Sequence, residues 1–112
     1  MKNVLFVCSA NVDRSKTAED CFSEVYKSCN FESAGTNHAI CNEKGTNFIN
    51  QELIEQAELI IVMEAKHRDW IYVNLDPKNT ELIVLDIQDI YKYYSPDLIK
   101  ILNDKCAHLL CS

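Results

Sequence analysis

Short apolar runs alternate along the chain with longer segments that have a helical pattern. Three runs of apolar and β-branched residues, at 3–7, 59–63 and 82–85, are bounded by polar positions. Such runs are typical of strands that are buried on both faces of a parallel sheet. Residues 30–34 can form a further short strand, which Gly35 ends. The pattern therefore predicts four strands.

The segments between these strands predict helices. After the first strand, apolar residues recur at i, i+3, i+4 and i+7 and mark one face of a helix over residues 15–27. The residues of this face are Ala18, Cys21, Phe22 and Val25. Three further helices are predicted, at 48–57, at 65–72 and after Ser95-Pro96, a good helix start. Residues 36–47 are polar and predict a loop.

The alternation of strands and helices predicts an α/β fold with a parallel sheet. The chain has 112 residues, of which 47% are hydrophobic, and this length suits one domain over residues 1–112. No apolar run approaches the ~20 residues of a membrane-spanning helix. The N-terminal residues lack the cleavage-site pattern of a secretory signal. We therefore expect a cytoplasmic protein without a membrane partner.

Charge and cysteine spacing exclude several classes of function. The net charge of −6 argues against a nucleic-acid partner, because such binders usually carry a basic face. The six cysteines form no Cys-x2-Cys pair and the histidines lack metal-ligand spacing, so we expect no metal and no cofactor. We expect most of the cysteines to be small apolar residues of the core: Cys21, Cys29, Cys41, Cys106 and Cys111.

The exception is Cys8, which opens a polar loop between the first predicted strand and the first predicted helix. Ligands of open α/β sheets bind at the carboxyl ends of the strands. A loop at that position can direct successive backbone N–H groups and a helix N-terminus at one anion. The residues that would surround the anion are Ser9, Ala10, Asn11, Val12, Asp13, Arg14 and Ser15. The sequence therefore predicts a phosphate-binding loop.

The residue types in this loop suit attack on phosphorus. A Cys8 thiolate is a strong nucleophile, and a helix N-terminus lowers the pKa of a cysteine. Arg14 can give two parallel hydrogen bonds to phosphate oxygens. Ser15 can donate to the sulfur, and Asn11 suits a left-handed backbone position. The alternative is that Cys8 is only a buried strand-end residue and Arg14 a solvated residue at a helix start.

Residues 4–19 resemble the start of the low-molecular-weight protein tyrosine phosphatases. Residues 33–36, Ser-Ala-Gly-Thr, are similar to the motif of that family after its second strand, and residues 58–64 are similar to its third strand. The resemblance implies a four-stranded parallel sheet of order 2-1-3-4 with helices on both faces. It also implies a phosphocysteine intermediate at Cys8.

The chain departs from the family pattern at Asp13, where relatives have a second loop cysteine. A carboxylate directed at the thiolate would raise the pKa of Cys8, so we expect Asp13 to point outward to a basic neighbour such as Lys16. The change also removes the partner that protects the nucleophile by forming a disulfide. The chain is shorter than typical relatives after Gly35, which implies a shallower substrate cleft.

A general acid is expected in residues 86–94, which follow the fourth strand and emerge on the same side as the phosphate loop. The family has its acid in an Asp-Pro-Tyr motif, to which Asp89-Ile90-Tyr91 is the nearest match, and this makes Asp89 the candidate. Asp86 is the alternative, and both carboxylates can also be ordinary solvated groups. Three tyrosines could contact an aromatic substrate, with Tyr91 the first candidate: Tyr91, Tyr93 and Tyr94.

The function that follows is a phosphate monoester hydrolase resembling protein tyrosine phosphatases. Cys8 is its nucleophile, Arg14 its phosphate ligand and Asp89 its acid, and the substrate is a phosphotyrosine protein or a small aryl phosphate. One alternative is an inactive module that binds a phosphorylated ligand, as Asp13 suggests. Another is an arsenate reductase, which needs two further cysteines to relay a disulfide, although none lies between Cys41 and Cys106.

Overall fold

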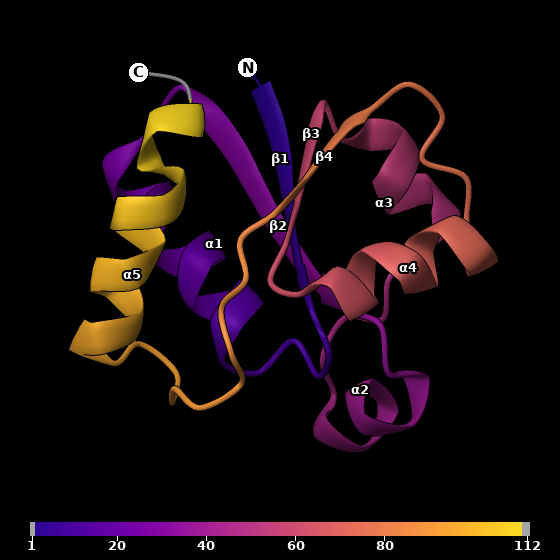
Figure 1. Ribbon diagram of the computed structural model, residues 1–112, viewed down its shortest axis with the longest axis horizontal. Coiled ribbons are helices and arrows are strands. Elements are labelled where there is room, and N and C mark those ends of the chain that lie inside the picture. The colour runs from indigo at the N-terminus through magenta and orange to yellow at the C-terminus, as the bar shows by residue number, and fades with distance from the viewer. Residues whose placement is uncertain (1, 111–112) are drawn as a thin grey trace.

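Four parallel strands form the centre of the computed structural model, which describes residues 2–110. Their order in the sheet is β2-β1-β3-β4, as the resemblance implied (Figure 1). The strands are β1 (Lys2–Cys8), β2 (Cys29–Gly35), β3 (Leu59–Val62) and β4 (Glu81–Val84). The α/β prediction is therefore confirmed, and the strand boundaries differ from the sequence pattern by one residue at most.

Helices cover both faces of the sheet. The helices are α1 (Arg14–Val25), α2 (His38–Lys44), α3 (Gln51–Gln56), α4 (Ala65–Asn74) and α5 (Pro96–Cys106), followed by a 3-10 turn, η1 (Ala107–Leu109). Helices α1 and α5 lie together on one face, and α3 and α4 lie on the other (Figure 1). None of the helices in the described part of the chain has the length and apolar character that crossing a membrane requires.

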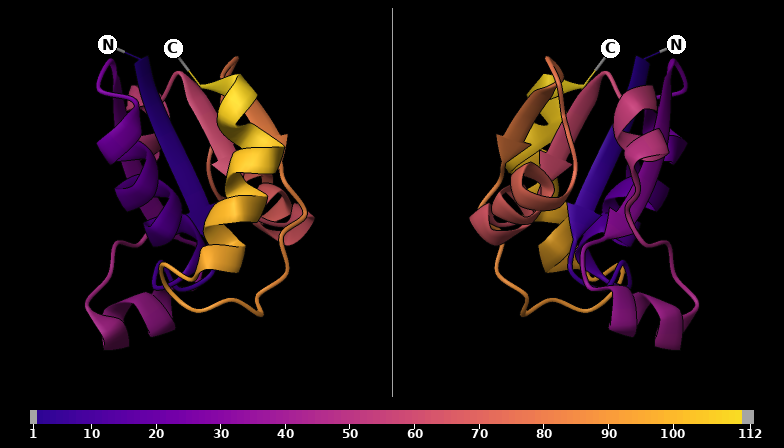
Figure 2. Two further views of the ribbon diagram at one scale, coloured as in Figure 1. Left: turned by 90° about the vertical axis from the view of Figure 1, so that its left-hand side faces the viewer. Right: turned by 90° about the vertical axis from the view of Figure 1, so that its right-hand side faces the viewer.

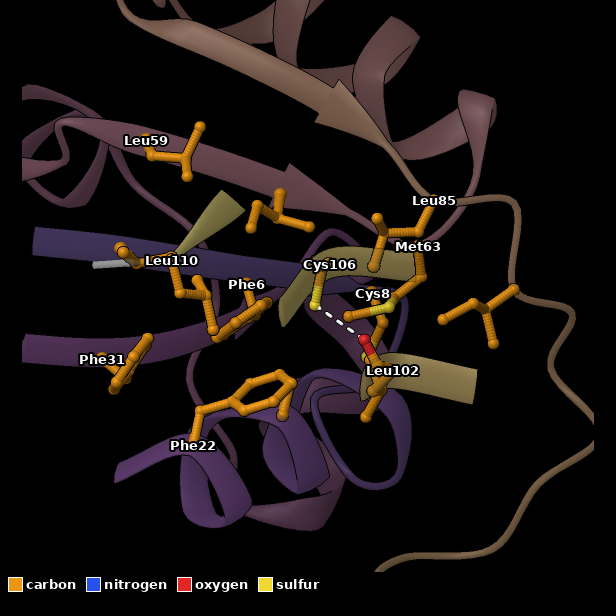
Figure 3. Close-up of a cluster of buried hydrophobic side chains, with 14 of the residues drawn as sticks. Phe6, Cys8, Phe22, Phe31, Leu59, Met63, Leu85, Leu102, Cys106 and Leu110 are labelled. Carbon is orange, nitrogen blue, oxygen red and sulfur yellow. Dashed lines mark hydrogen bonds between the residues drawn. The ribbon is translucent and has the colours of Figure 1, made fainter. Parts of the chain in front are cut away.

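Aromatic rings fill the core between the sheet and the helices α1 and α5 (Figure 3). The ring centroid of Phe6 lies 5.8 Å from that of Phe22 and 5.9 Å from that of Phe31. Cys8 belongs to the same cluster, and Cys106 closes it by donating its thiol to the Leu102 carbonyl at 3.1 Å.

The cysteines predicted to fill the core mostly do so. Cys29, Cys41 and Cys106 are buried and Cys21 is half-buried, while Cys111 lies outside the described residues.

The carboxyl ends of the strands meet at one edge of the sheet. In the register, Cys8 at the end of β1 lies opposite Gly35 at the end of β2, and Val7 lies opposite Val62 of β3. The loop after β1, helix α2 and the connection from β4 to α5 all lie at this edge (Figure 1, Figure 2). Segments that are distant in sequence therefore come together around Cys8.

The prediction of a loop over residues 36–47 is wrong, because α2 forms within it. The side chain of Asn37 caps this helix by accepting a hydrogen bond from the Ile40 amide at 3.1 Å. Gly45 ends it in a left-handed conformation with φ of 68°. Cys41, whose side chain is fully buried, anchors the short helix to the body of the protein.

Candidate active site

Cys8 is the last residue of β1 and is almost fully buried, with 3% of its surface exposed. Its Sγ lies 3.0 Å from the Ser15 hydroxyl in the first turn of α1. The Asn11 amide nitrogen donates to that hydroxyl at 2.9 Å, and the Asn47 backbone amide donates to Asn11 Oδ1 at 3.1 Å. Because Ser15 already accepts a hydrogen bond, its own hydrogen is available to the sulfur.

The loop between β1 and α1 has the backbone features of an anion-binding turn. Asn11 has φ of 57°, which is the left-handed conformation that the sequence predicts for it. Within residues 2–110, the backbone amides of residues 9–15 donate to no protein acceptor. Unpaired amides in a loop that leads into a helix N-terminus form a site for a phosphate group.

Arg14 is the first residue of α1, and its side chain is only 1% exposed. Its Nη1 donates to the Ile87 carbonyl at 2.8 Å and to the carboxylate of Glu64. Its Nε faces Asp89 Oδ1 at 3.6 Å. The alternative of a solvated arginine is therefore wrong: Arg14 is held rigidly beside the loop.

Asp89 is the carboxylate of the β4–α5 connection that reaches Arg14. Its side chain is 60% exposed, so it is open to a ligand from solvent. Asp86 is also exposed, and the acceptor that it offers within the protein is its backbone carbonyl, which Lys105 contacts at 3.3 Å. Among residues 2–110, the geometry thus brings the Asp89 carboxylate to Arg14 and does not bring the Asp86 carboxylate there.

Known structures share this architecture, although no protein-family model and no curated protein sequence matches the chain. The YwlE arginine phosphatase from Geobacillus stearothermophilus is 20% identical, with a TM-score of 0.75 over 97% of this chain and 92% of that one. The low-molecular-weight protein tyrosine phosphatase from T. tengcongensis is 21% identical, with a TM-score of 0.76 over 98% and 100%. The tyrosine phosphatase Wzb from Escherichia coli K30, in complex with phosphate, is 18% identical, with 0.76 over 96% and 95%. The fold is that of the low-molecular-weight protein tyrosine phosphatases.

Within this phosphatase fold, Asp13 takes a partner that the sequence does not predict. Its Oδ1 accepts a hydrogen bond from the backbone amide of Tyr93 at 2.8 Å. Lys16, the expected partner, instead pairs with Glu19 at 3.3 Å and with Asp20 at 3.5 Å. The expectation of an Asp13–Lys16 pair is wrong, because Glu19 and Asp20 follow the lysine by three and four residues on the same face of α1.

Sequence reasoning missed His67, a buried histidine that contacts the loop of this phosphatase fold. Its Nδ1 accepts a hydrogen bond from the Glu64 amide at 3.0 Å, so a neutral ring carries its hydrogen on Nε2 and donates it to the Ser9 hydroxyl at 2.9 Å. Burial, together with the positive charge of Arg14, lowers the pKa of His67 to about 4. The ring is therefore neutral near pH 7.

Glu64 was also missed as a site residue. Burial raises the pKa of Glu64, but the hydrogen bond and charge of Arg14 outweigh this effect and hold the pKa below its ordinary value. The signal that could have found both Glu64 and His67 is their place directly after β3, at the edge of the sheet where the loop lies.

A hollow of about 510 Å³ adjoins the loop, and Lys16, Lys44 and Tyr93 contribute to its lining with Asn11 and Val12. Tyr91 is partly buried against the core on the α1–α5 face. Tyr93 therefore lies nearer the mouth of the loop than the tyrosine that the sequence favours. Among residues 2–110, no group of three or more His, Cys, Asp or Glu side chains is arranged to hold a metal ion.

Proposed function

We propose that this protein hydrolyses phosphate monoesters, with Cys8 as nucleophile, Arg14 as phosphate ligand and Asp89 as general acid. The observation that carries the proposal is the loop of unpaired amides in which Ser15 contacts the Cys8 sulfur and Arg14 is held alongside. The nearest alternative, an inactive binding module, has the same anion site but no need for a carboxylate at Asp89.

The reaction takes place in two steps. In the first, the Cys8 thiolate forms a bond to phosphorus while the bond from phosphorus to the leaving oxygen breaks, and Asp89 gives its proton to that oxygen. In the second, water attacks the phosphocysteine, Asp89 takes up a proton from the water, and inorganic phosphate leaves. The thiolate is restored with Ser15 as its hydrogen-bond donor.

Arg14 binds the phosphate through the part of its guanidinium that the protein leaves available. Nη1 is engaged by Glu64 and Ile87, whereas Nε makes no hydrogen bond within residues 2–110 and faces the Asp89 carboxylate at 3.6 Å. The phosphate of a substrate takes the place beside Nε and receives two parallel hydrogen bonds, and Asp89 then faces the leaving oxygen. Glu64 keeps the guanidinium in the orientation that this requires.

The loop supplies the remaining donors to phosphate. The proposed ligands are the amides of residues 9–15, that is Ser9, Ala10, Asn11, Val12, Asp13, Arg14 and Ser15. Since His67 donates to the Ser9 oxygen, the Ser9 hydroxyl hydrogen can turn to the phosphate. Fixed donors around the phosphate stabilise the charge of the transition state. No metal or cofactor takes part in these steps.

The proposed substrates are aryl phosphates, either phosphotyrosine in a protein or a small molecule. The hollow beside the loop suits an aromatic leaving group that contacts Tyr93, or Tyr91 if its ring turns outward. Two of the similar structures are named as tyrosine phosphatases and one as an arginine phosphatase, so phosphoarginine is a useful comparison substrate. An arsenate reductase is disfavoured, because Cys41 and Cys106 are fully buried and cannot readily relay a disulfide outward.

The test is hydrolysis of p-nitrophenyl phosphate in the presence of a metal chelator. The wild-type protein should turn the substrate over, and a rapid acid quench should leave phosphate on the peptide that contains Cys8. Cys8→Ser should abolish turnover but still bind inorganic phosphate, and Arg14→Lys should be nearly as damaging, because a lysine cannot give the paired hydrogen bonds. Cys21→Ser, which changes a half-buried cysteine of α1, is the matched control.

Two results would overturn the assignment. Phosphate binding without any turnover by the wild type would favour the inactive module. Substantial turnover by a correctly folded Cys8→Ser protein would remove Cys8 as the nucleophile.

A further inference from the structure

The segment that carries Asp89, residues 85–94, has neither helix nor strand. We call it the acid segment. Two of its residues, Asp86 and Tyr94, have positive φ angles of 59° and 60°, a conformation that residues other than glycine adopt reluctantly. Contacts with the rest of the protein must therefore fix its course.

The start of the segment is held by β3 and by Lys105 of α5, and its end is held by α1 and the loop before it. The Tyr94 amide donates to the Thr17 hydroxyl at 2.8 Å, and the Tyr93 hydroxyl donates to Asp20. The Tyr93 amide donates to the Asp13 carboxylate at 2.8 Å. Of these acceptors, Asp13 is the one that lies within the phosphate loop itself.

Asp13 is also an unusual helix cap. An aspartate at this position normally accepts a hydrogen bond from an amide in the first turn of its own helix. Here the side chain of Asp13 makes no such bond to α1, and its carboxylate binds Tyr93 instead. A negative charge in an anion-binding loop opposes both the thiolate and the phosphate, and here the Tyr93 amide engages this charge.

We propose that Asp13 is a positioning residue, which joins the acid segment to the phosphate loop and thereby places Asp89 for proton transfer. This inference rests on the proposed function. The Tyr93 amide donates a charge-assisted hydrogen bond to the Asp13 carboxylate, and Arg14 donates to the carbonyl of Ile87, two residues before Asp89. The acid is thus tied on both sides to two adjacent residues of the loop that binds phosphate.

The inference predicts a specific kinetic defect. Loss of the Asp13 acceptor frees the acid segment without disturbing Cys8, so only reactions that need the proton should slow. If Asp13 acted merely through its charge on the thiolate, its removal would instead favour the nucleophile, and the leaving group would not matter. An amide at this position separates the two effects, because asparagine keeps the acceptor oxygen and loses the charge.

The experiment compares Asp13→Ala with Asp13→Asn in single-turnover cleavage of phenyl phosphate and of dinitrophenyl phosphate, whose leaving group needs no proton. Asp13→Ala should slow phenyl phosphate by about 10- to 100-fold, part of the effect of a general acid, and dinitrophenyl phosphate by no more than about twofold. Asp13→Asn, which keeps an acceptor oxygen for the Tyr93 amide, should keep the wild-type ratio of the two rates. Asp104→Ala, on an exposed carboxylate of α5, is the matched control.

Testing Asp13→Ala in the Asp89→Asn variant separates this inference from the proposed function. In Asp89→Asn, which should itself slow phenyl phosphate, adding Asp13→Ala should cause no further loss. If Asp89→Asn shows no dependence on the leaving group, the acid assignment fails. If Asp89→Asn behaves as expected and Asp13→Ala slows both substrates equally, matches Asp13→Asn, or adds to Asp89→Asn, the positioning role of Asp13 is overturned.

Asp13→Ser keeps the test available if Asp13→Ala does not fold. Serine is a good N-terminal cap for α1 but is too short to replace the bond to Tyr93. It should therefore show the same selective loss as Asp13→Ala.

Discussion

The direction of the hydrogen bonds at Cys8 follows from one side chain. The backbone amide of Asn47 must donate, which fixes Asn11 Oδ1 on that side and turns the Asn11 NH2 group to Ser15. The Ser15 hydroxyl then directs its hydrogen to the Cys8 sulfur at 3.0 Å, since the Ala34 carbonyl is farther away at 3.5 Å. A donor that is fixed in this way can hydrogen-bond to a negatively charged sulfur when Cys8 leaves phosphorus.

Ser15→Ala should accordingly impair the step in which Cys8 leaves as a thiolate. The loss of one hydrogen bond to a charged group predicts hydrolysis of phosphocysteine about 10- to 100-fold slower. Pre-steady-state kinetics with p-nitrophenyl phosphate would show this as a burst of nitrophenol followed by a slow phase. Ser23→Ala, an exposed serine on α1, is the control. An unchanged second phase would mean that Ser15 is not the donor to the sulfur.

His67 makes the stability of the fold dependent on pH. Its pKa is about 4 in the folded protein and about 6.5 in an unfolded chain, so the unfolded state binds the proton more readily. Its contribution to stability is complete above pH 6.5 and is lost as the pH falls toward 4, by up to about 3 kcal/mol. Urea unfolding of the wild type and of His67→Gln across this range should differ in slope. Parallel pH profiles would contradict a buried neutral His67.

At the residue scale, the sequence was sufficient to predict the arrangement of residues that interact with near neighbours in the chain. Cys8, Asn11 and Ser15 lie within one loop, and the left-handed position of Asn11 was predicted. The partners of Asp13 and His67 were not predictable, because they lie 80 and 58 residues away in the chain. Only the folded sheet edge brings such residues together.

At the scale of elements, the end of β2 determines the shape of the phosphate loop. Gly35 pairs with Cys8 across the sheet, and a Cβ at this position would lie 2.4 Å from the Ser9 carbonyl oxygen and 2.7 Å from the Cys41 sulfur. The Ser9 carbonyl is in turn fixed by the Asn37 amide at 3.0 Å. Gly35 of the Ser-Ala-Gly-Thr motif, at the end of β2, therefore leaves the space that the loop after β1 occupies.

Gly35→Ala should displace the loop after β1, because the added Cβ would clash with the Ser9 carbonyl. Overpacking of this kind costs about 1–3 kcal/mol, and the shift of Ser9 should also lower kcat. Thermal unfolding and hydrolysis of p-nitrophenyl phosphate would measure the two effects. Gly45→Ala is a useful comparison, since a Cβ there has open space and only the left-handed conformation opposes it. Full activity and stability in Gly35→Ala would show that the loop does not depend on this contact.

The sequence predicted the strands and the longer helices correctly but not α2. A helix of seven residues is too short to show an apolar periodicity, and most of its residues are exposed. Its signals were the Asn37 cap and Gly45, which are equally common in polar loops. The order of the strands likewise came from the resemblance, because periodicity alone does not determine which strands are neighbours.

At the scale of the whole molecule, the proposed anion site depends on local donors within an acidic protein. The net charge is −6, yet lysines border the loop on both sides, Lys16 and Lys44 in one hollow and Lys66 in another.

The reactivity of the thiols also depends on their local surroundings. Cys106 is buried in the core, where burial raises its pKa to about 12, and it is therefore unreactive.

This distribution of thiols predicts how the protein responds to oxidation. With Asp13 in the loop, Cys8 has no adjacent cysteine, and the fully buried Cys41 directs its sulfur at the carbonyls of Ser9 and Ala10, at 3.8 and 3.6 Å. Cys8 oxidised by peroxide should therefore proceed to the sulfinic acid, which thiols do not reduce. After prolonged treatment, dithiothreitol should leave activity lost, and mass spectrometry should find two added oxygens on the Cys8 peptide. Inorganic phosphate, by occupying the loop, should protect against the loss. Full recovery with dithiothreitol would contradict the prediction, and a Cys8–Cys41 disulfide in the oxidised protein would show that the loop moves far enough for Cys41 to replace the missing cysteine.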